Sequence, residues 1–109
     1  MRLTCLVLAA AGVAALACSD DPSGPTGGHS TTISVRDNFF TPSPDTVPAG
    51  QVTFSWAGTN HNVTWLTGPT TPANSATQSS GTHAATLSAG TYTYHCTNHP
   101  GMDGTIVVQ

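Results

Sequence analysis

Short runs in which apolar and polar residues alternate recur along most of the chain. The alternation is seen at Ile33 and Val35, and again in the segments 51–56 (QVTFSW), 61–65 (HNVTW) and 91–96 (TYTYHC). A period of two with one apolar face is typical of a half-buried antiparallel strand. Turn residues separate the runs, and no stretch has a helical period of useful length. The pattern therefore predicts an all-β domain, most simply a small β-sandwich. The polar segment 68–81 is predicted to be a long surface loop.

The N-terminal part of the chain has a different pattern. Residues 1–17 contain one basic residue followed by apolar and small residues, which predicts a secretory signal peptide. The apolar run is too short for a comfortable membrane span. It ends at Cys18, and the preceding Ala15-Leu16-Ala17 resembles the lipobox of bacterial lipoproteins, although Ala15 stands where leucine is usual. Cys18 is therefore expected to be lipidated; an ordinary signal peptide cut near the same place is the alternative.

Residues 18–30 are rich in Gly, Pro, Ser and Asp and contain no large apolar residue. Such a segment cannot bury a core and is predicted to be a flexible linker behind the lipid anchor. The folded domain is then expected over residues 31–109. This organisation places the domain outside the cytoplasm, on the periplasmic side, held at a membrane by its lipid anchor only.

Charged residues are scarce. After the signal peptide, Arg36 is the only basic residue and no lysine occurs. Binding to nucleic acid needs a basic surface that meets the phosphates, so this class of partner is not expected.

Cys96 is the only cysteine of the predicted folded domain. Small exported domains normally use cysteines in disulfide pairs. A single cysteine indicates a metal ligand, a reactive thiol or a bridge between chains.

The segment from Cys96 to Met102 decides between these alternatives. It places a thiolate, the imidazole of His99 and the thioether of Met102 at three-residue intervals. Two histidines, one cysteine and a weak axial methionine define the blue-copper electron-transfer site. The second histidine must come from elsewhere, and His61 is the best placed, because the alternation turns it inward at the start of its predicted strand. His95 neighbours Cys96 on a strand, so its side chain is expected on the opposite face.

The domain resembles a cupredoxin of the plastocyanin, pseudoazurin and amicyanin group. The resemblance covers almost all of residues 31–109 and rests on the motifs His61-Asn62-Val63, Gly90-Thr91-Tyr92, Tyr94-His95-Cys96 and Gly104-Thr105-Ile106-Val107-Val108. The short spacings from Cys96 to Met102 are similar to the amicyanin loop. The resemblance implies a Greek-key β-sandwich that holds one copper ion through His61, Cys96, His99 and Met102.

The resemblance also implies roles for neighbouring residues. Asn62 is expected to pin the ligand loop by hydrogen bonding near Thr97, and the N–H of Asn98 to reach the sulfur of Cys96. His99 is expected at the solvent edge, where Pro100 and Gly101 form part of a flat docking surface for redox partners. Phe39 or Phe40 is expected to pack near the site.

The leading hypothesis is a monomeric one-electron carrier that serves extracytoplasmic redox partners, such as a cytochrome, an oxidase or a reductase. An alternative is a copper-handling protein that delivers the ion to an oxidase; a vestigial metal motif on a binding or structural sandwich is a third. An enzyme is not expected, because the sequence shows no second metal cluster and a four-ligand copper site leaves no open position for a substrate.

Overall fold

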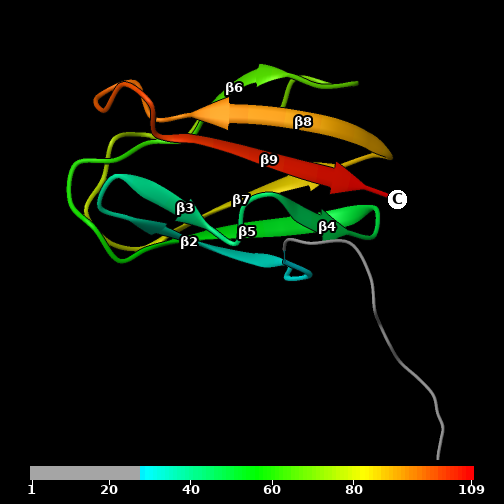
Figure 1. Ribbon diagram of the computed structural model, residues 1–109, viewed down its shortest axis with the longest axis horizontal. Helices are drawn as coiled ribbons and strands as arrows, with labels where there is room; N and C mark the ends of the chain where they lie inside the picture. Colours follow the sequence, from blue (N-terminus) through cyan, green and yellow to red (C-terminus); the bar gives the residue numbers. More distant parts are fainter. Residues whose placement is uncertain (1–27) are drawn as a thin grey trace, which may run out of the picture.

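The computed structural model describes residues 28–109, which form two four-stranded sheets packed face to face (Figure 1). One sheet has the order β3–β2–β5–β7, from β2 (Thr32–Arg36), β3 (Phe39–Thr41), β5 (Gly50–Trp56) and β7 (Thr82–Leu87). The other has the order β4–β9–β8–β6, from β4 (Asp45–Val47), β6 (Thr64–Thr67), β8 (Gly90–His95) and β9 (Asp103–Val108). No helix occurs in residues 28–109, and hence none that could cross a membrane. The predicted all-β sandwich is confirmed. The predicted signal peptide, Cys18 anchor and most of the linker lie outside the described residues.

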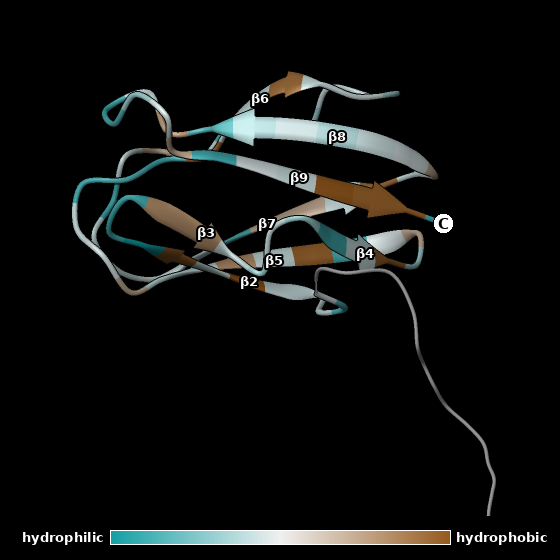
Figure 2. Cartoon of the chain, in the orientation of Figure 1, coloured by the Kyte–Doolittle hydropathy of each residue, from teal (hydrophilic) through white to brown (hydrophobic). Residues whose placement is uncertain are grey.

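The alternating residues form the inner faces of the two sheets. In β5, Val52, Phe54 and Trp56 are buried while the residues between them are half-buried. In β8, Tyr92 and Tyr94 are fully buried, as is Ile106, which lies opposite Tyr92 in β9. Apolar residues are concentrated along β5 and β9, whereas β8 appears nearly neutral because threonine and tyrosine alternate in it (Figure 2). The period-two pattern therefore identified the buried positions of these strands.

The pairing of the strands differs from the antiparallel arrangement that the alternation suggested. β2 runs parallel to β5, and β4 runs parallel to β9. The remaining named pairs are antiparallel. Alternation reports which side chains face the core and carries no information on the direction of the neighbouring strand. Strands β3, β4 and β7 were also not predicted; the first two have three residues each, too few to show a period.

Tyr94 lies at the centre of an aromatic core. Its ring centroid is 4.7 Å from that of Phe40, 5.2 Å from that of Phe54 and 5.4 Å from that of Trp65, all in edge-to-face contacts. Such pairs contribute about 0.5–1.5 kcal/mol each beyond the burial of their surface. The same side chain covers Gly104, which pairs with Tyr94 across β8 and β9. β8, the strand that directly precedes Cys96, is thus firmly packed.

Asp45 connects the first described residues to the sandwich. Its Oδ1 accepts a hydrogen bond of 2.9 Å from the amide of Ser30, and Gly28 pairs with β4 at the same place. The side chain is 1% exposed, and its Oδ2 has no hydrogen-bond partner among the described residues. Burial raises the pKa of the Asp45 carboxyl despite the opposing hydrogen bonds from Ser30 and Thr46.

We expect Asp45→Asn to increase the free energy of unfolding of the metal-free protein at pH 7 by about 1 kcal/mol, because it removes a buried charge and keeps the acceptor for Ser30. The pKa of Asp45 is higher in the folded than in the unfolded chain. At a pH between these two pKa values, the folded state binds more protons than the unfolded state. The contribution of Asp45 to stability therefore falls as the pH rises from the lower to the higher pKa. Urea unfolding from pH 3.5 to 7 checks this: the difference between variant and native protein should grow with pH. The exposed Asp103, changed to asparagine, is the control. A variant less stable than the native protein at pH 7 would contradict the prediction.

Candidate metal centre

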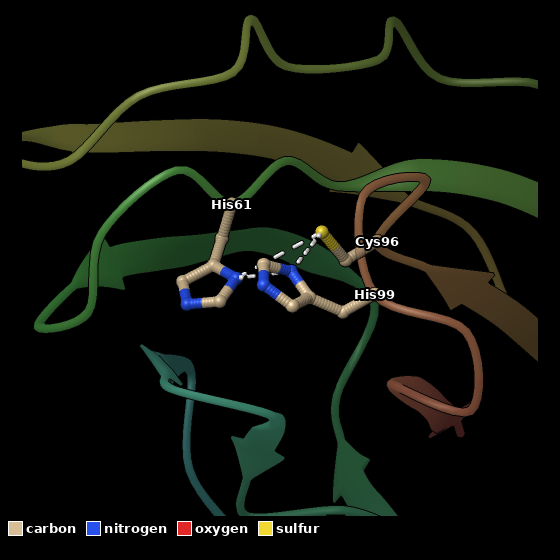
Figure 3. A group of neighbouring side chains, drawn as sticks. All are labelled: His61, Cys96 and His99. Carbon is tan, nitrogen blue, oxygen red and sulfur yellow. Dashed lines mark hydrogen bonds between the residues drawn. The ribbon is translucent and has the colours of Figure 1, made fainter.

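Three metal-binding side chains meet at one end of the sandwich. His61 comes from the connection between β5 and β6, and Cys96 and His99 come from the connection between β8 and β9 (Figure 3). The sulfur of Cys96 is 3.8 Å from Nδ1 of His61 and 3.5 Å from Nδ1 of His99, and the two Nδ1 atoms are 3.1 Å apart. All three donor atoms lie within 4.8 Å of one another. The geometry therefore brings together residues that are 35 positions apart in the sequence.

The loop from Cys96 to Met102 is closed by its own backbone. The amide of Cys96 donates to the carbonyl of Met102 (3.0 Å), and the amide of Met102 donates to the carbonyl of His99 (3.0 Å). Gly101 has φ 85°, a conformation that other residues rarely adopt. Met102 is 1% exposed, so its thioether is buried, and its backbone pairs with that of Cys96. Short local contacts thus set the spacing of the three loop donors.

His61 is held by its backbone rather than by a strand. The sequence pattern placed it at the start of a strand, but β6 begins three residues later, at Thr64. His61 instead forms an isolated bridge with Gln78, with N–H···O distances of 3.1 and 2.9 Å. Its carbonyl also accepts a hydrogen bond of 2.9 Å from the indole of Trp56. His61 is 1% exposed, and these contacts leave its ring little freedom.

The predicted surface loop supplies much of this support. Its residues 73–78 run beside residues 61–65, and Ser75 bonds with the backbone of Val63 through both its amide (2.9 Å) and its hydroxyl (2.7 Å). The side chain of Asn74 accepts from the amide of Trp65 at 2.9 Å. Sequence reasoning missed this supporting role, because the segment has no apolar alternation that would indicate a paired strand.

Asn62 joins three segments through its buried amide. Its Nδ2 donates to Oγ1 of Thr97 (2.8 Å) and to Oγ1 of Thr77 (3.0 Å). Its Oδ1 accepts from the amide of Thr97 (3.2 Å) and from the hydroxyl of Thr64 (2.9 Å). The amide group is therefore fully hydrogen-bonded, which a buried polar group requires. Through Thr97, Asn62 ties the loop of Cys96 to the segment of His61.

The other residues singled out from the sequence lie around the donors. Asn98 donates through its side chain to the carbonyl of Asn60 (3.1 Å), while the expected contact of its N–H with the Cys96 sulfur stays a prediction. His99 is half-buried, and Pro100 and Gly101 are exposed beside it. Phe40 is buried against Tyr94, whereas Phe39 is 49% exposed.

His95 is half-buried and does not belong to the cluster of donors. The alternating burial along β8 places it on the opposite side from Tyr94 and Cys96. His83 is half-buried, and its Nε2 is 3.0 Å from the carbonyl oxygen of Ala73. Among the described histidines, His61 and His99 are therefore the two that face Cys96.

A carboxylate that the sequence analysis did not single out contacts the cluster. Oδ1 of Asp37 lies 2.9 Å from Nε2 of His61. Asp37 belongs to the turn between β2 and β3, 24 residues before His61. No spacing or motif in the sequence connects the two residues. Only a strand order that brings this turn beside His61 could reveal the contact.

The donor set fits copper. Thiolate and thioether sulfur are soft ligands that suit Cu(I), and imidazole suits both oxidation states of the ion. His61, Cys96, His99 and Met102 thus form a potential ligand set, able to bind one copper ion. When bound, copper supplies a couple that exchanges one electron.

Known structures resemble this chain in fold. A reduced Cu(I) form of an amicyanin variant shares 27% sequence identity, with 79% of this chain and 86% of the amicyanin covered and a TM-score of 0.57. A purple cupredoxin from Nitrosopumilus maritimus shares 20% identity, with coverage of 72% and 98% and a TM-score of 0.61.

A copper-containing nitrite reductase from Thermus scotoductus SA-01 also matches, at 20% identity and a TM-score of 0.61 over 84% of this chain. The chain spans only 24% of that enzyme's length, so this match shows the fold of one part of it.

No curated protein sequence matches the chain. A family model does: residues 7–108 match the model of the cupredoxin-like domain. Because this match covers nearly the whole chain and agrees with the fold, the protein belongs to the cupredoxin-like family.

Proposed function

We propose that the protein is a mononuclear type 1 copper protein that carries single electrons between redox partners outside the cytoplasm. His61, Cys96 and His99 would hold the copper, with Met102 as the axial ligand. The observation that carries the proposal is the convergence of one sulfur and two Nδ1 atoms within 4.8 Å, at a buried position beside a buried methionine. This combination of donors is the one used for electron transfer.

Rigid support of the donors favours electron transfer, because a site that changes little between the two oxidation states exchanges electrons readily. The bridge to Gln78 and the indole of Trp56 hold the backbone of His61. The pair Asn62 and Thr97 holds the loop of Cys96. The burial of His61 and Cys96, at 1% and 2% exposure, also excludes bulk water from the donors.

The half-buried His99 is the least buried of the four donors and provides the route for the electron. Its exposed neighbours Pro100 and Gly101 form the surface on which a partner, such as a cytochrome, oxidase or reductase, would dock. We propose a carrier rather than an enzyme, because four protein donors leave no open position on the ion for a substrate.

The position of the first described residue suits a tethered carrier. The described chain starts at Gly28, which pairs with β4 at the end of the sandwich remote from the loop of Cys96 (Figure 1). A lipid anchor at Cys18 on the outer side of a membrane would then leave the copper donors free of the point of attachment. The anchor and the periplasmic location are part of the proposal.

The test is the visible absorption of the protein with one equivalent of Cu(II). We expect an intense blue band that disappears with ascorbate and returns on oxidation. A protein that binds Cu(I) tightly but stays colourless with Cu(II) would contradict the electron carrier and favour the copper-handling alternative. Binding of neither ion would indicate a vestigial site.

A further inference from the structure

We propose that Asp37 is a positioning residue for the copper site, which holds His61 with Nδ1 facing the metal and lowers the reduction potential. This inference rests on the proposed function, because it assigns a role toward the copper ion that His61 would bind. It concerns a contact between the turn of a β-hairpin and the most deeply buried histidine of the donor set.

The contact determines which nitrogen of His61 is available. An ionised carboxylate can only accept hydrogen bonds, so Nε2 of His61 must carry the proton that is shared with Asp37 over 2.9 Å. Nδ1 then keeps its lone pair, and this is the atom that faces the sulfur of Cys96. In the metal-free protein Nδ1 of His61 therefore accepts, and Nδ1 of His99 donates, over their 3.1 Å separation.

The carboxylate is held in place although 70% of its side chain is exposed. The amide of Thr59 donates to the same Oδ1 at 3.1 Å. Two N–H donors, from His61 and Thr59, thus converge on one carboxylate oxygen and fix its position.

Gly58 makes this close approach possible. A Cβ atom at Gly58 would lie 2.5 Å from Oδ1 of Asp37 and 2.8 Å from its amide nitrogen. The amides of Ala57 and Gly58 both donate to the carbonyl of Val35, at 2.8 and 3.0 Å. Hydrogen bonds thus join residues 57–59 to the hairpin of β2 and β3, and they hold the turn of Asp37 against the segment that leads to His61.

The expected consequence is a site that favours Cu(II). A carboxylate that shares the second ring proton increases the basicity of a ligand histidine and fixes its orientation. Its negative charge also stabilises the oxidation state with the higher positive charge. Both effects strengthen Cu(II) binding more than Cu(I) binding, which lowers the reduction potential.

The first experiment needs no copper. In ¹⁵N NMR spectra of the metal-free protein, we expect His61 to be the Nε2–H tautomer in the native protein and in Asp37→Asn, whose amide oxygen can still accept. In Asp37→Ala, the two tautomers should mix. A His61 that carries its proton on Nδ1 in the native protein, or that is unaffected by Asp37→Ala, would overturn the proposal.

The second experiment uses the copper-loaded protein expressed as the full chain. We expect Asp37→Ala to lose about 10- to 100-fold in Cu(II) affinity, to lose less in Cu(I) affinity, and to have a raised reduction potential. Asp37→Asn should recover part of the Cu(II) affinity. Asp103→Asn, which removes a charge next to Met102, should change the Cu(II) affinity and the reduction potential little. Equal losses for the two ions with an unchanged potential would show a merely structural role and overturn the proposal. Absence of a blue band in the native protein would instead contradict the proposed function, whereas the NMR result would still decide on the contact.

Discussion

Replacing Cys96 with serine is expected to abolish the intense visible band of the copper-loaded protein. The band requires charge transfer from a thiolate sulfur to Cu(II), and a serine hydroxyl is neither soft nor ionised near neutral pH. The buried sulfur of Cys96 lies within 3.8 Å of both Nδ1 atoms, and residues 28–109 contain no other cysteine that could replace it. Absorption and electron paramagnetic resonance spectra of both proteins with one equivalent of Cu(II) measure the effect.

The same substitution should remove most of the stabilisation by copper. Binding to the folded state alone stabilises a protein by about 4 kcal/mol when the free ligand is about 1,000-fold above its dissociation constant. The native protein should therefore unfold at clearly higher urea concentration with copper than without it, and Cys96→Ser should show little difference between the two conditions.

His95→Ala is the matched control for Cys96→Ser. His95 precedes Cys96 directly but lies on the opposite side of β8 and outside the donor cluster. We expect this variant to keep the blue band and the stabilisation by copper. A band that survives in Cys96→Ser, or that disappears in His95→Ala, would refute the assignment of the ligands.

Gly104→Ala is expected to reduce the free energy of unfolding by about 1–3 kcal/mol, the range typical of overpacked cores. A Cβ atom at this position would lie 2.2 Å from Cζ and 2.4 Å from the hydroxyl oxygen of Tyr94. The ring cannot retreat easily, because it is fully buried between Phe40, Phe54 and Trp65. Urea unfolding of the metal-free variant measures the loss.

The control for Gly104→Ala is Thr105→Ala, at the neighbouring position of β9. Thr105 is half-buried on the outer side of the sheet, so its replacement should cost less than about 0.5 kcal/mol, as is usual for surface positions. Because Tyr94 lies two residues before Cys96, the strain in Gly104→Ala should also weaken copper binding. Equal stability of the two variants would mean that the ring of Tyr94 has room to move.

Much of the candidate site could be predicted because its information is local. The loop donors Cys96, His99 and Met102 lie within seven residues, and hydrogen bonds inside the loop hold them. Their chemistry and spacing indicate copper without any knowledge of the fold. Similarly, the alternation in β5 and β8 identified the buried side chains, because a strand turns successive residues to opposite faces.

The environment of His61 could be predicted only in part from the residues around it in the sequence. Alternation turned its side chain inward, and its side chain is buried. Strict alternation would turn Asn62 to the opposite face of a strand, whereas residues 61, 62 and 63 are all buried. The segment 73–78 packs against Asn62 and buries it. The residues around His61 contain no pattern from which this contact could be predicted.

The sequence by itself determined the class of the fold, the faces of the longer strands and the chemistry of the donor loop, because each depends on neighbours within a few residues. Only the tertiary structure decided that β2 and β4 run parallel to their partners, that residues 73–78 support His61, and that Asp37 reaches its Nε2. These contacts depend on the order of strands in two sheets. Period-two alternation is the same for every order that buries the same faces, so it could not distinguish among them.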